Sequence, residues 1–522
     1  MTTFQRSLVL GCSALALAGC GADEIVSPGT GGDVIINNPT PSPTPAPTPT
    51  PTSSLVTPAA GCPTISDPKG LTDNNTISGP TGEYRVCTLP ARFTASSTLP
   101  YIEGLLYRMN GRVDVGTDGG PSADESDGAS DTNVELTIEP GVIIYATGAS
   151  FLNVNRGNTI EANGTAERPI IFTSRDNVQG LNGEGASGQW GGVVLSGRAP
   201  VTDCVAEGAT PGSVNCERQV EGAADPAIFG GATADDSSGS MQYVQIRYSG
   251  FVLSGDNELQ SLTTGGTGSG TTLENIMSFN SSDDGVEFFG GRVNVKGLIV
   301  VGAEDDSLDT DTGVKANLQY VVAIQRPGAG DTIIESDSDN AFNDSTPRQN
   351  TRISNATFVH QNAIDQVVRI RGFADYSIAN SVIVSARDTA CLRVDGQEEL
   401  TRTTGPDEAG PVAFDSLVMD CATPFRDGSG ATAANVQTVF DAGSNNNSAF
   451  TNTLSMLFLN GANEDGVAVF DVSEWDAFFE TPTFVGAVSA ANRDWVNGWT
   501  CNSATVTFDE AVTSCTSLPV YN

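Results

Sequence analysis

A repeated pattern of apolar and polar positions runs through the central part of the chain. Its unit begins with an apolar residue and continues with alternating polar and apolar residues, and it starts at Met241, Leu273, Val295, Leu318, Ile353 and Ile378. The starts from Leu273 to Leu318 are separated by 22 and 23 residues, and the other intervals are longer. A period near 22 with insertions is typical of a right-handed parallel β-helix, in which each coil buries its apolar face only against neighbouring coils. The pattern therefore predicts an all-β solenoid.

Apolar runs before residue 200 fit as earlier coils of the same solenoid. They occupy residues 134–138, 141–145, 151–154, 169–172 and 192–195. The 58 glycines and the absence of sustained helical periodicity also favour β structure. A β-sandwich is the competing fold, but it gives no reason for a period of 22 residues.

Asparagine recurs at the third position of the repeat, as Asn275, Asn355 and Asn380. Asparagine tolerates the left-handed backbone of a tight turn, and stacked asparagines can form hydrogen bonds from coil to coil. We therefore interpret these residues as structural.

The first twenty residues resemble a bacterial lipoprotein signal peptide. One charged residue, Arg6, precedes an apolar run that is too short to span a bilayer, and small residues lead to Cys20. The resemblance implies that residues 1–19 are removed and that Cys20 carries lipid; an ordinary secretory signal with an accidental cysteine is the alternative. Gly21 after the cysteine favours the outer membrane, with the protein facing the exterior or the periplasm.

The segment after Cys20 predicts a stalk. Residues 39–52 are almost entirely proline and threonine, and such segments adopt extended, semi-rigid polyproline II geometry. We expect residues 20–61 to form a lipid anchor and stalk, and residues 62–522 to form the β-helix with a C-terminal cap.

Eight cysteines remain after Cys12 in the leader and the lipidated Cys20 are set aside. An even number agrees with disulfides in an oxidising compartment. Proximity in sequence suggests the pairs Cys62–Cys87, Cys204–Cys216, Cys391–Cys421 and Cys501–Cys515.

The excess of acidic over basic residues restricts the kinds of molecule that the protein can bind. The chain has 63 acidic and 25 basic residues, for a net charge of −38. Nucleic acids are repelled by such a surface, and cations are attracted. The single histidine, His360, excludes a histidine-rich metal site and leaves little room for histidine catalysis.

Several longer motifs resemble a family of bacterial surface lipoproteins with a pectin-lyase-like β-helix. They lie at residues 161–174 (EANGTAERPIIFTS), 189–200 (QWGGVVLSGRAP), 281–291 (SSDDGVEFFGG) and 304–311 (EDDSLDTD), and the tail at 484–488 and 495–500 is also similar. The resemblance implies fold and location. It implies no reaction, because the family has no settled enzymatic activity.

Carboxylates fall into register when the coils that start at Leu273 and Val295 are superimposed. The aligned pairs are Asp283 with Asp305, Asp284 with Asp306, and Glu287 with Asp309. Stacked strands lie about 4.8 Å apart, so each pair would repel by roughly 1 kcal/mol in water and about 3 kcal/mol at an effective dielectric near 20. Asp311 and the acidic residues Glu335, Asp337 and Asp339 extend the region by proximity in sequence.

Three interpretations of these carboxylates remain open. A hard cation, Ca²⁺ by its preference for oxygen ligands in flexible geometry, could lie between the coils. The side chains could instead form a solvated acidic face. Paired carboxylates could also act as acid and base on a polysaccharide. In lyases of this fold a basic residue abstracts the proton, and Arg326, Arg369 and Arg371 lie on neighbouring coils.

Two functional classes follow. In the first, the protein is a structural or binding module for a glycan or an outer-membrane protein, and Ca²⁺ between the coils would stabilise it. In the second, it is a carbohydrate-active lyase or hydrolase that uses the acidic columns. The sequence favours the first class, because no catalytic motif of a β-helix enzyme is complete.

Overall fold

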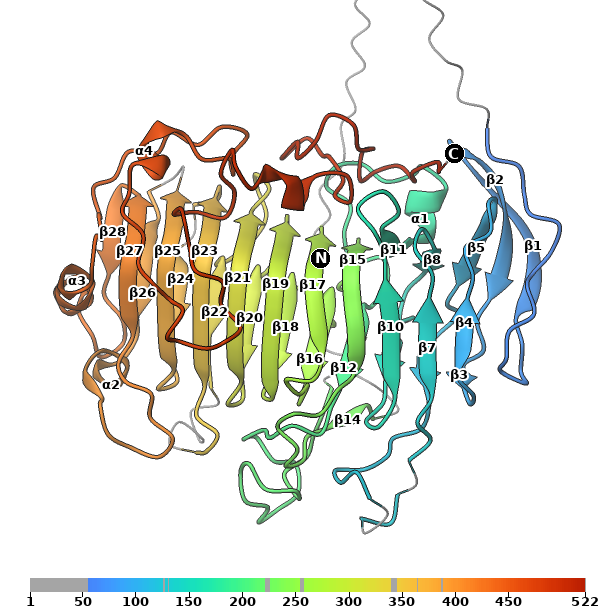
Figure 1. Ribbon diagram of the computed structural model, residues 1–522, viewed down its shortest axis with the longest axis horizontal. Helices are drawn as coiled ribbons and strands as arrows, with labels where there is room; N and C mark the ends of the chain where they lie inside the picture. The colour runs from blue at the N-terminus through green and yellow to red at the C-terminus, as the bar shows by residue number, and fades with distance from the viewer. Residues whose placement is uncertain are drawn as a thin grey trace, which may run out of the picture. The chain divides into compact units, whose positions relative to one another are not determined.

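Parallel strands stack along the chain in the computed structural model, which describes residues 55–521 except 125–126, 130, 221–225, 254–257, 339–344, 364 and 386–387. The described strands form a 15-stranded sheet A, an 11-stranded sheet B and a two-stranded ribbon (Figure 1). Each coil contributes strands to both large sheets, which confirms the predicted all-β parallel β-helix. The leader, Cys20, the stalk as far as residue 54, and Asp339 lie outside the described residues.

Sheet A contains the longer strands. They are β1 (Thr72–Gly79), β2 (Gly82–Thr88), β4 (Ser97–Leu99), β5 (Leu105–Arg108), β7 (Glu135–Ile138), β8 (Ile143–Ala146), β10 (Thr159–Asn163), β11 (Ile170–Ser174), β15 (Gly239–Arg247), β17 (Thr272–Phe279), β19 (Arg292–Val301), β21 (Lys315–Ile324), β23 (Asn350–His360), β25 (Asp375–Ser385) and β27 (Ala413–Asp420).

Sheet B contains β3 (Arg92–Phe93), β6 (Val113–Val115), β9 (Leu152–Val154), β12 (Val193–Ser196), β16 (Leu262–Gly265), β18 (Val286–Phe289), β20 (Leu308–Asp311), β22 (Ile334–Ser336), β24 (Gln366–Ile370), β26 (Ala390–Val394) and β28 (Thr423–Arg426). The ribbon is β13 (Arg218–Gln219) with β14 (Ile228–Phe229). The described helices are α1 (Arg175–Val178), α2 (Gln397–Thr401), α3 (Ala433–Ala442), α4 (Ala462–Asp465) and a 3₁₀ turn (Arg493–Val496).

The register of sheet A agrees with the sequence repeat. Leu273 is aligned with Val295, Val295 with Leu318, Leu318 with Ile353, and Ile353 with Ile378. These side chains are at most 2% exposed and belong to the core between the sheets. The prediction of one inward apolar column is therefore confirmed.

The third position of the repeat forms a bulge in each strand. Asn275, Asn355 and Asn380 have φ angles of 54°, 56° and 49°, which confirms the expected left-handed backbone. The pairing between β17 and β19 skips Asn275, so this residue stands outside the ladder. Asn355 Nδ2 donates to the Phe484 carbonyl at 2.7 Å, and Asn380 Nδ2 donates to the Phe470 carbonyl at 3.0 Å. Asn355 and Asn380 therefore attach the C-terminal segment to the sheet.

The C-terminal segment, residues 443–521, runs along the outer side of sheet A (Figure 1). Its Trp499 packs in a buried cluster with Met277, Ile299 and Val322, whose side chains point away from the central core. Burial of this second apolar layer explains why strands β17 to β21 are apolar on both faces.

The two ends of the solenoid are covered differently. At one end β1 pairs with β2 in antiparallel orientation, and the exposed side chains of β1 are mostly polar. At the other end α3 is capped by Thr432 and places Phe440 against Phe425 and Phe414, with ring centroids 5.3 and 6.1 Å apart. Figure 1 shows β1 and α3 at opposite ends of the stack.

Four disulfides staple the fold. Their pairs are Cys62–Cys87, Cys204–Cys216, Cys391–Cys421 and Cys501–Cys515, as predicted from proximity. Among the described helices, none has the length and apolar character needed to cross a bilayer.

Candidate functional site

The predicted carboxylates lie where the chain turns from sheet A into sheet B. Asp283 and Asp284 lie between β17 and β18, and Asp305 and Asp306 occupy the same turn of the next coil, between β19 and β20. Glu287 in β18 is aligned with Asp309 in β20. The structure therefore brings all three predicted pairs onto neighbouring coils.

Side-chain oxygens from these coils approach closely. One group of Asp283, Asp284 and Asp305, and a second of Asp284, Glu287 and Asp309, each offer ligand oxygens that lie within 4.8 Å of one another. We call the residues of these groups, with Asp306 and Asp331, the carboxylate cluster. Five residues of the cluster line a cleft of about 530 Å³, together with Glu258, Gln260, Ser282 and Glu304; the five are Asp283, Asp284, Glu287, Asp305 and Asp309. No described Lys or Arg is among the residues that line this cleft.

Two of the carboxylates hold the backbone of the following coil. Asp284 Oδ1 accepts a hydrogen bond from the Asp306 amide at 2.9 Å, and Asp306 Oδ1 accepts one from the Thr332 amide at 2.7 Å. Both aspartates are buried, with 6% and 5% exposure. Part of the acidic column is therefore a structural ladder between turns, which the spacing alone did not reveal.

Burial and mutual repulsion disfavour the charged forms of these groups. Burial, followed by the carboxylates of Glu258 and Asp305, raises the pKa of Asp283 to about 7. Burial raises the pKa values of Asp284, Asp306 and Asp309 well above the usual range, and neighbouring carboxylates add to each shift. Buried carboxylates that repel one another reach a more favourable state in one of two ways: they bind a cation, or they keep their protons.

The structure extends the cluster beyond the predicted residues. Asp331 forms a third group with Asp305 and Asp306, with ligand oxygens within 4.8 Å. It follows Asp305 by 26 residues rather than 22, because β20 is aligned with β22 at that larger offset. Alignment of the inward residues Leu308 and Ile334 in the sequence would have placed Asp331 next to Asp305.

Asp311 does not belong to any of the three described groups. It is aligned with Phe289 at the far end of β20, and its side chain accepts a hydrogen bond from the Thr312 amide.

Along sheet B, a column of aligned side chains changes from acidic to basic. Glu287, Asp309 and Glu335 are aligned in turn, and Glu335 is aligned with Arg369. Arg369 Nη1 lies 2.8 Å from Glu335 Oε1. The acidic side chains of this column that are not aligned with an arginine thus lie on the coils of β18 and β20.

The arginines considered as bases are engaged elsewhere. Arg326 pairs with Glu304, and Arg371 Nη2 lies 2.5 Å from Asp337 Oδ2. Arg369 pairs with both Glu335 and Asp395, and these ion pairs raise its pKa despite burial. An arginine held protonated by two carboxylates is a poor proton acceptor. The geometry therefore fits cation binding better than proton abstraction by an arginine.

The donor set fits a hard divalent cation. Oxygen ligands from three or more carboxylates, with irregular geometry, are the ligands that Ca²⁺ takes in proteins. Asp283 and Asp305 are the residues we would expect to hold it, together with Asp284, which completes their group and whose Oδ1 also accepts a backbone hydrogen bond.

Comparison with known proteins supports the fold. No curated protein matches the chain, and no solved structure matches it. A family profile described as a pectate-lyase-like beta-helix domain matches residues 129–500, which is more than half of the chain and includes the carboxylate cluster. This match supports a general role in binding or acting on carbohydrate. The chain belongs to the family of pectate-lyase-like β-helix domains.

Proposed function

We propose that the protein is a lipid-anchored module of the outer membrane that holds Ca²⁺ in the carboxylate cluster and binds a glycan or a surface protein along its flank. Cys20 is the proposed lipid attachment site, and the Pro/Thr stalk is the proposed spacer. The observation that supports calcium most directly is the approach of carboxylate oxygens from two neighbouring coils to within 4.8 Å.

Calcium binding would relieve an unfavourable arrangement in the folded protein. A pair of charges 4.8 Å apart repels by about 3 kcal/mol at an effective dielectric near 20, and burial adds to that cost. An ion that binds only the folded stack stabilises it by RT ln(1 + [L]/Kd), which is about 2.7 kcal/mol at a hundredfold excess over Kd. Calcium would thereby fasten one coil to the next.

The test is a calcium titration of the melting temperature. We expect millimolar Ca²⁺ to raise the Tm of the full chain, and we expect Asp283→Asn with Asp305→Asn to remove most of the response. Glu510→Gln is the matched control, because Glu510 is an exposed carboxylate outside the cleft. If Ca²⁺ and chelator give the same Tm for the parent, the cluster is a solvated acidic face and the calcium proposal fails.

A carbohydrate-active enzyme is the second candidate, and one observation favours it. The pKa of Asp283, raised to about 7 by burial and neighbouring carboxylates, would leave a substantial fraction of that group protonated near neutral pH, as a general acid requires. Incubation with a panel of polysaccharides tests this candidate. New reducing ends or unsaturated products that disappear in Asp283→Asn would establish catalysis.

A further inference from the structure

A second cleft lies on the opposite side of the coil from the carboxylate cluster, over the starts of three strands in sheet A. It has a volume of about 850 Å³, which is within the range of small-molecule sites. Strands β19, β21 and β23 form its floor, and residues 407–409 and 476–478 form its walls. The two clefts share no lining residue. We call this second cleft the basic groove.

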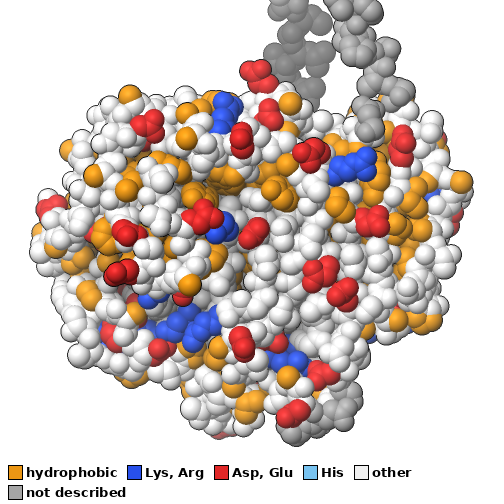
Figure 2. Space-filling model, in the orientation of Figure 1, with side chains coloured by type: hydrophobic (Ala, Val, Ile, Leu, Met, Phe, Trp, Pro, Cys, Tyr) orange, Lys and Arg blue, Asp and Glu red, His pale blue; other side chains and the backbone are white. Residues whose placement is uncertain are grey.

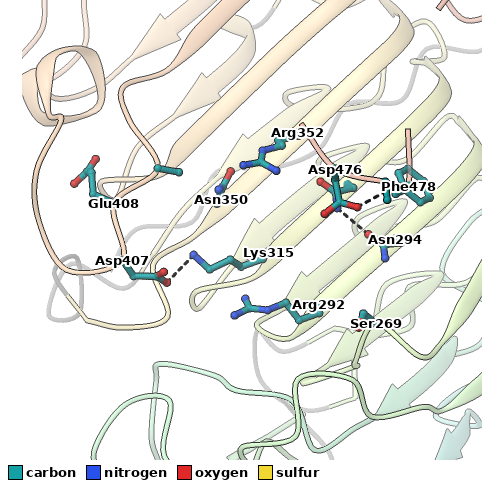
Figure 3. A pocket seen from close by; sticks show the side chains of 13 residues that line it. Ser269, Arg292, Asn294, Lys315, Asn350, Arg352, Asp407, Glu408, Asp476 and Phe478 are labelled. Carbon is teal, nitrogen blue, oxygen red and sulfur yellow. Dashed lines mark hydrogen bonds and ion pairs between the residues drawn. The ribbon is translucent and has the colours of Figure 1, made fainter. Parts of the chain in front are cut away.

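Three cations gather on the floor of the basic groove. Arg292 is aligned with Lys315 on the next coil, and Arg352 lies one coil further and two residues along its strand. Figure 3 shows the head groups of Arg292 and Lys315 pointing toward the loop that carries Asp407. Basic side chains also stand out low on the visible face in Figure 2, near the starts of these strands. The chain has 25 basic and 63 acidic residues, so three basic side chains on neighbouring strands are unusual and point to a function.

The floor cations have few partners of their own. Lys315 Nζ lies 2.6 Å from Asp407 Oδ2, whereas neither Arg292 nor Arg352 forms an ion pair among the described residues. Arg352 Nη1 donates to the Trp475 carbonyl at 2.6 Å. The buried Nη1 of Arg292 has no hydrogen-bond acceptor in the described part of the chain. A buried donor without an acceptor is unfavourable, and burial also lowers the pKa of Arg292.

The acidic residues of the groove leave this excess in place. Glu408 is held by Arg402 at 2.7 Å and by Arg348 at 3.7 Å. Asp407 is taken up by Lys315, as described above. Asp476 lies at the exposed rim, where its Oδ1 accepts a hydrogen bond from the Phe478 amide at 2.9 Å. The charge of Asp407 acts on Arg292 as well as on Lys315, so two carboxylates, Asp407 and Asp476, face the three floor cations among the described residues.

The rest of the lining suits a sugar. Asn317 Nδ2 donates to Asn294 Oδ1 at 3.0 Å on the neighbouring coil, and each amide retains further donor or acceptor capacity for hydroxyl groups. The Phe478 ring is half-buried at the wall, and Lys296 Nζ lies over this ring, 5.3 Å from its centroid. Polar amides beside an aromatic ring and a charged centre form a mixed lining that orients a polar ligand.

We propose that the basic groove binds a saccharide that carries a tetrahedral oxyanion, a sulfate or phosphate ester, between Arg292, Lys315 and Arg352. Three donors from three separate coils match the three free oxygens of such an ester better than the two oxygens of a planar carboxylate. The sugar ring lies toward Asn294 and Phe478. This inference rests on the proposed carbohydrate binding and names its ligand class and its place on the molecule.

The test uses one polysaccharide backbone with different substituents. Dextran, dextran sulfate, phosphorylated dextran and carboxymethyl dextran, matched in length and substitution, are titrated against the full chain in detergent with Ca²⁺ present. We expect binding of the sulfate form, the phosphate form or both, and the comparison of these two arms identifies the ester. Because the protein carries a net charge of −38, unspecific attraction of a polyanion is disfavoured.

Variants locate the site. Arg292→Gln with Arg352→Gln should weaken binding at least tenfold, and Asp476→Asn should strengthen it several-fold by removing the rim charge. Arg426→Gln is the matched control, because Arg426 is a partly exposed arginine that pairs with Asp365 outside the groove. The calcium-dependent Tm, measured on every variant, reports whether the fold is intact.

Three results would overturn the inference. They are equal binding of neutral dextran, equal binding of carboxymethyl dextran, and an affinity that the double arginine variant does not change. Each leaves the calcium response intact, so the failure of this inference is distinguishable from failure of the proposed function, which the calcium titration decides.

Discussion

The raised pKa values of the carboxylate cluster predict an unusual dependence of stability on pH. A carboxylate stabilised by ion pairs has a lowered pKa in the folded state, and its contribution to stability is lost in acid. The cluster has the opposite sign. Burial and neighbouring carboxylates raise the pKa of Asp283 to about 7 in the folded state, whereas an aspartate in the unfolded chain has a pKa near 3.8. Between about pH 4 and pH 7 the folded state therefore holds protons that the unfolded state has released, and the free energy of unfolding falls as the pH rises.

The size of the effect follows from the same values. The difference between 3.8 and about 7 at Asp283 corresponds to about 4 kcal/mol, at about 1.4 kcal/mol for each pKa unit. His360 acts in the other direction. Burial lowers its pKa to about 4, so its contribution to stability rises between about pH 4 and pH 6.5. We therefore compare the free energy of unfolding of the parent with that of the double variant Asp283→Asn, Asp305→Asn. Both proteins contain His360, so its contribution cancels in the difference.

The measurement is urea unfolding at several pH values from 4.5 to 8 in metal-free buffer, followed by tryptophan fluorescence. We expect the double variant to be more stable than the parent at pH 7.5, by a few kcal/mol, and the two to converge toward pH 4.5. Glu510→Gln should follow the parent at every pH. A difference that does not depend on pH, or a double variant that is less stable at pH 7.5, would refute the reasoning.

Two further predictions concern the anchor and the core. Cys20→Ala should release the protein from the membrane fraction, because no described helix could serve as another anchor; retention in washed membranes would contradict the lipid attachment. Val295→Asp should cost several kcal/mol and prevent folding, because Val295 is 1% exposed and stacks between Leu273 and Leu318, where an unpaired charge has no partner. A melting transition equal to that of the parent would contradict the inward position.

The sequence predicted the fold best where successive coils have the same length. Leu273, Val295 and Leu318 follow at nearly equal intervals, so the register of β17, β19 and β21 and the first three carboxylate pairs could be inferred directly. Asp331 was missed because four additional residues enter the coil before it, and a fixed period places it out of column.

The basic groove could not be predicted from the same repeat. Arg292 and Lys315 are aligned at the polar starts of their strands, but Arg352 is aligned with Asn317 and lies two residues out of their column. One of its two walls contains Asp476 and Phe478, which are more than 120 residues further along the chain than Arg352. Contacts that join such distant segments follow from the path of the C-terminal segment, and no periodicity encodes that path.

The covered ends of the solenoid decide how the protein can associate with other molecules. An open strand at the end of a parallel stack is a template on which another copy could continue the sheet. Here the polar antiparallel strand β1 faces outward at one end, and α3 shields the last coil with Phe440 at the other. Growth into filaments by continuation of the sheet is thereby disfavoured at both described ends. Recognition must then occur sideways, so a long ligand could lie across several coils and bridge neighbouring molecules without joining their sheets.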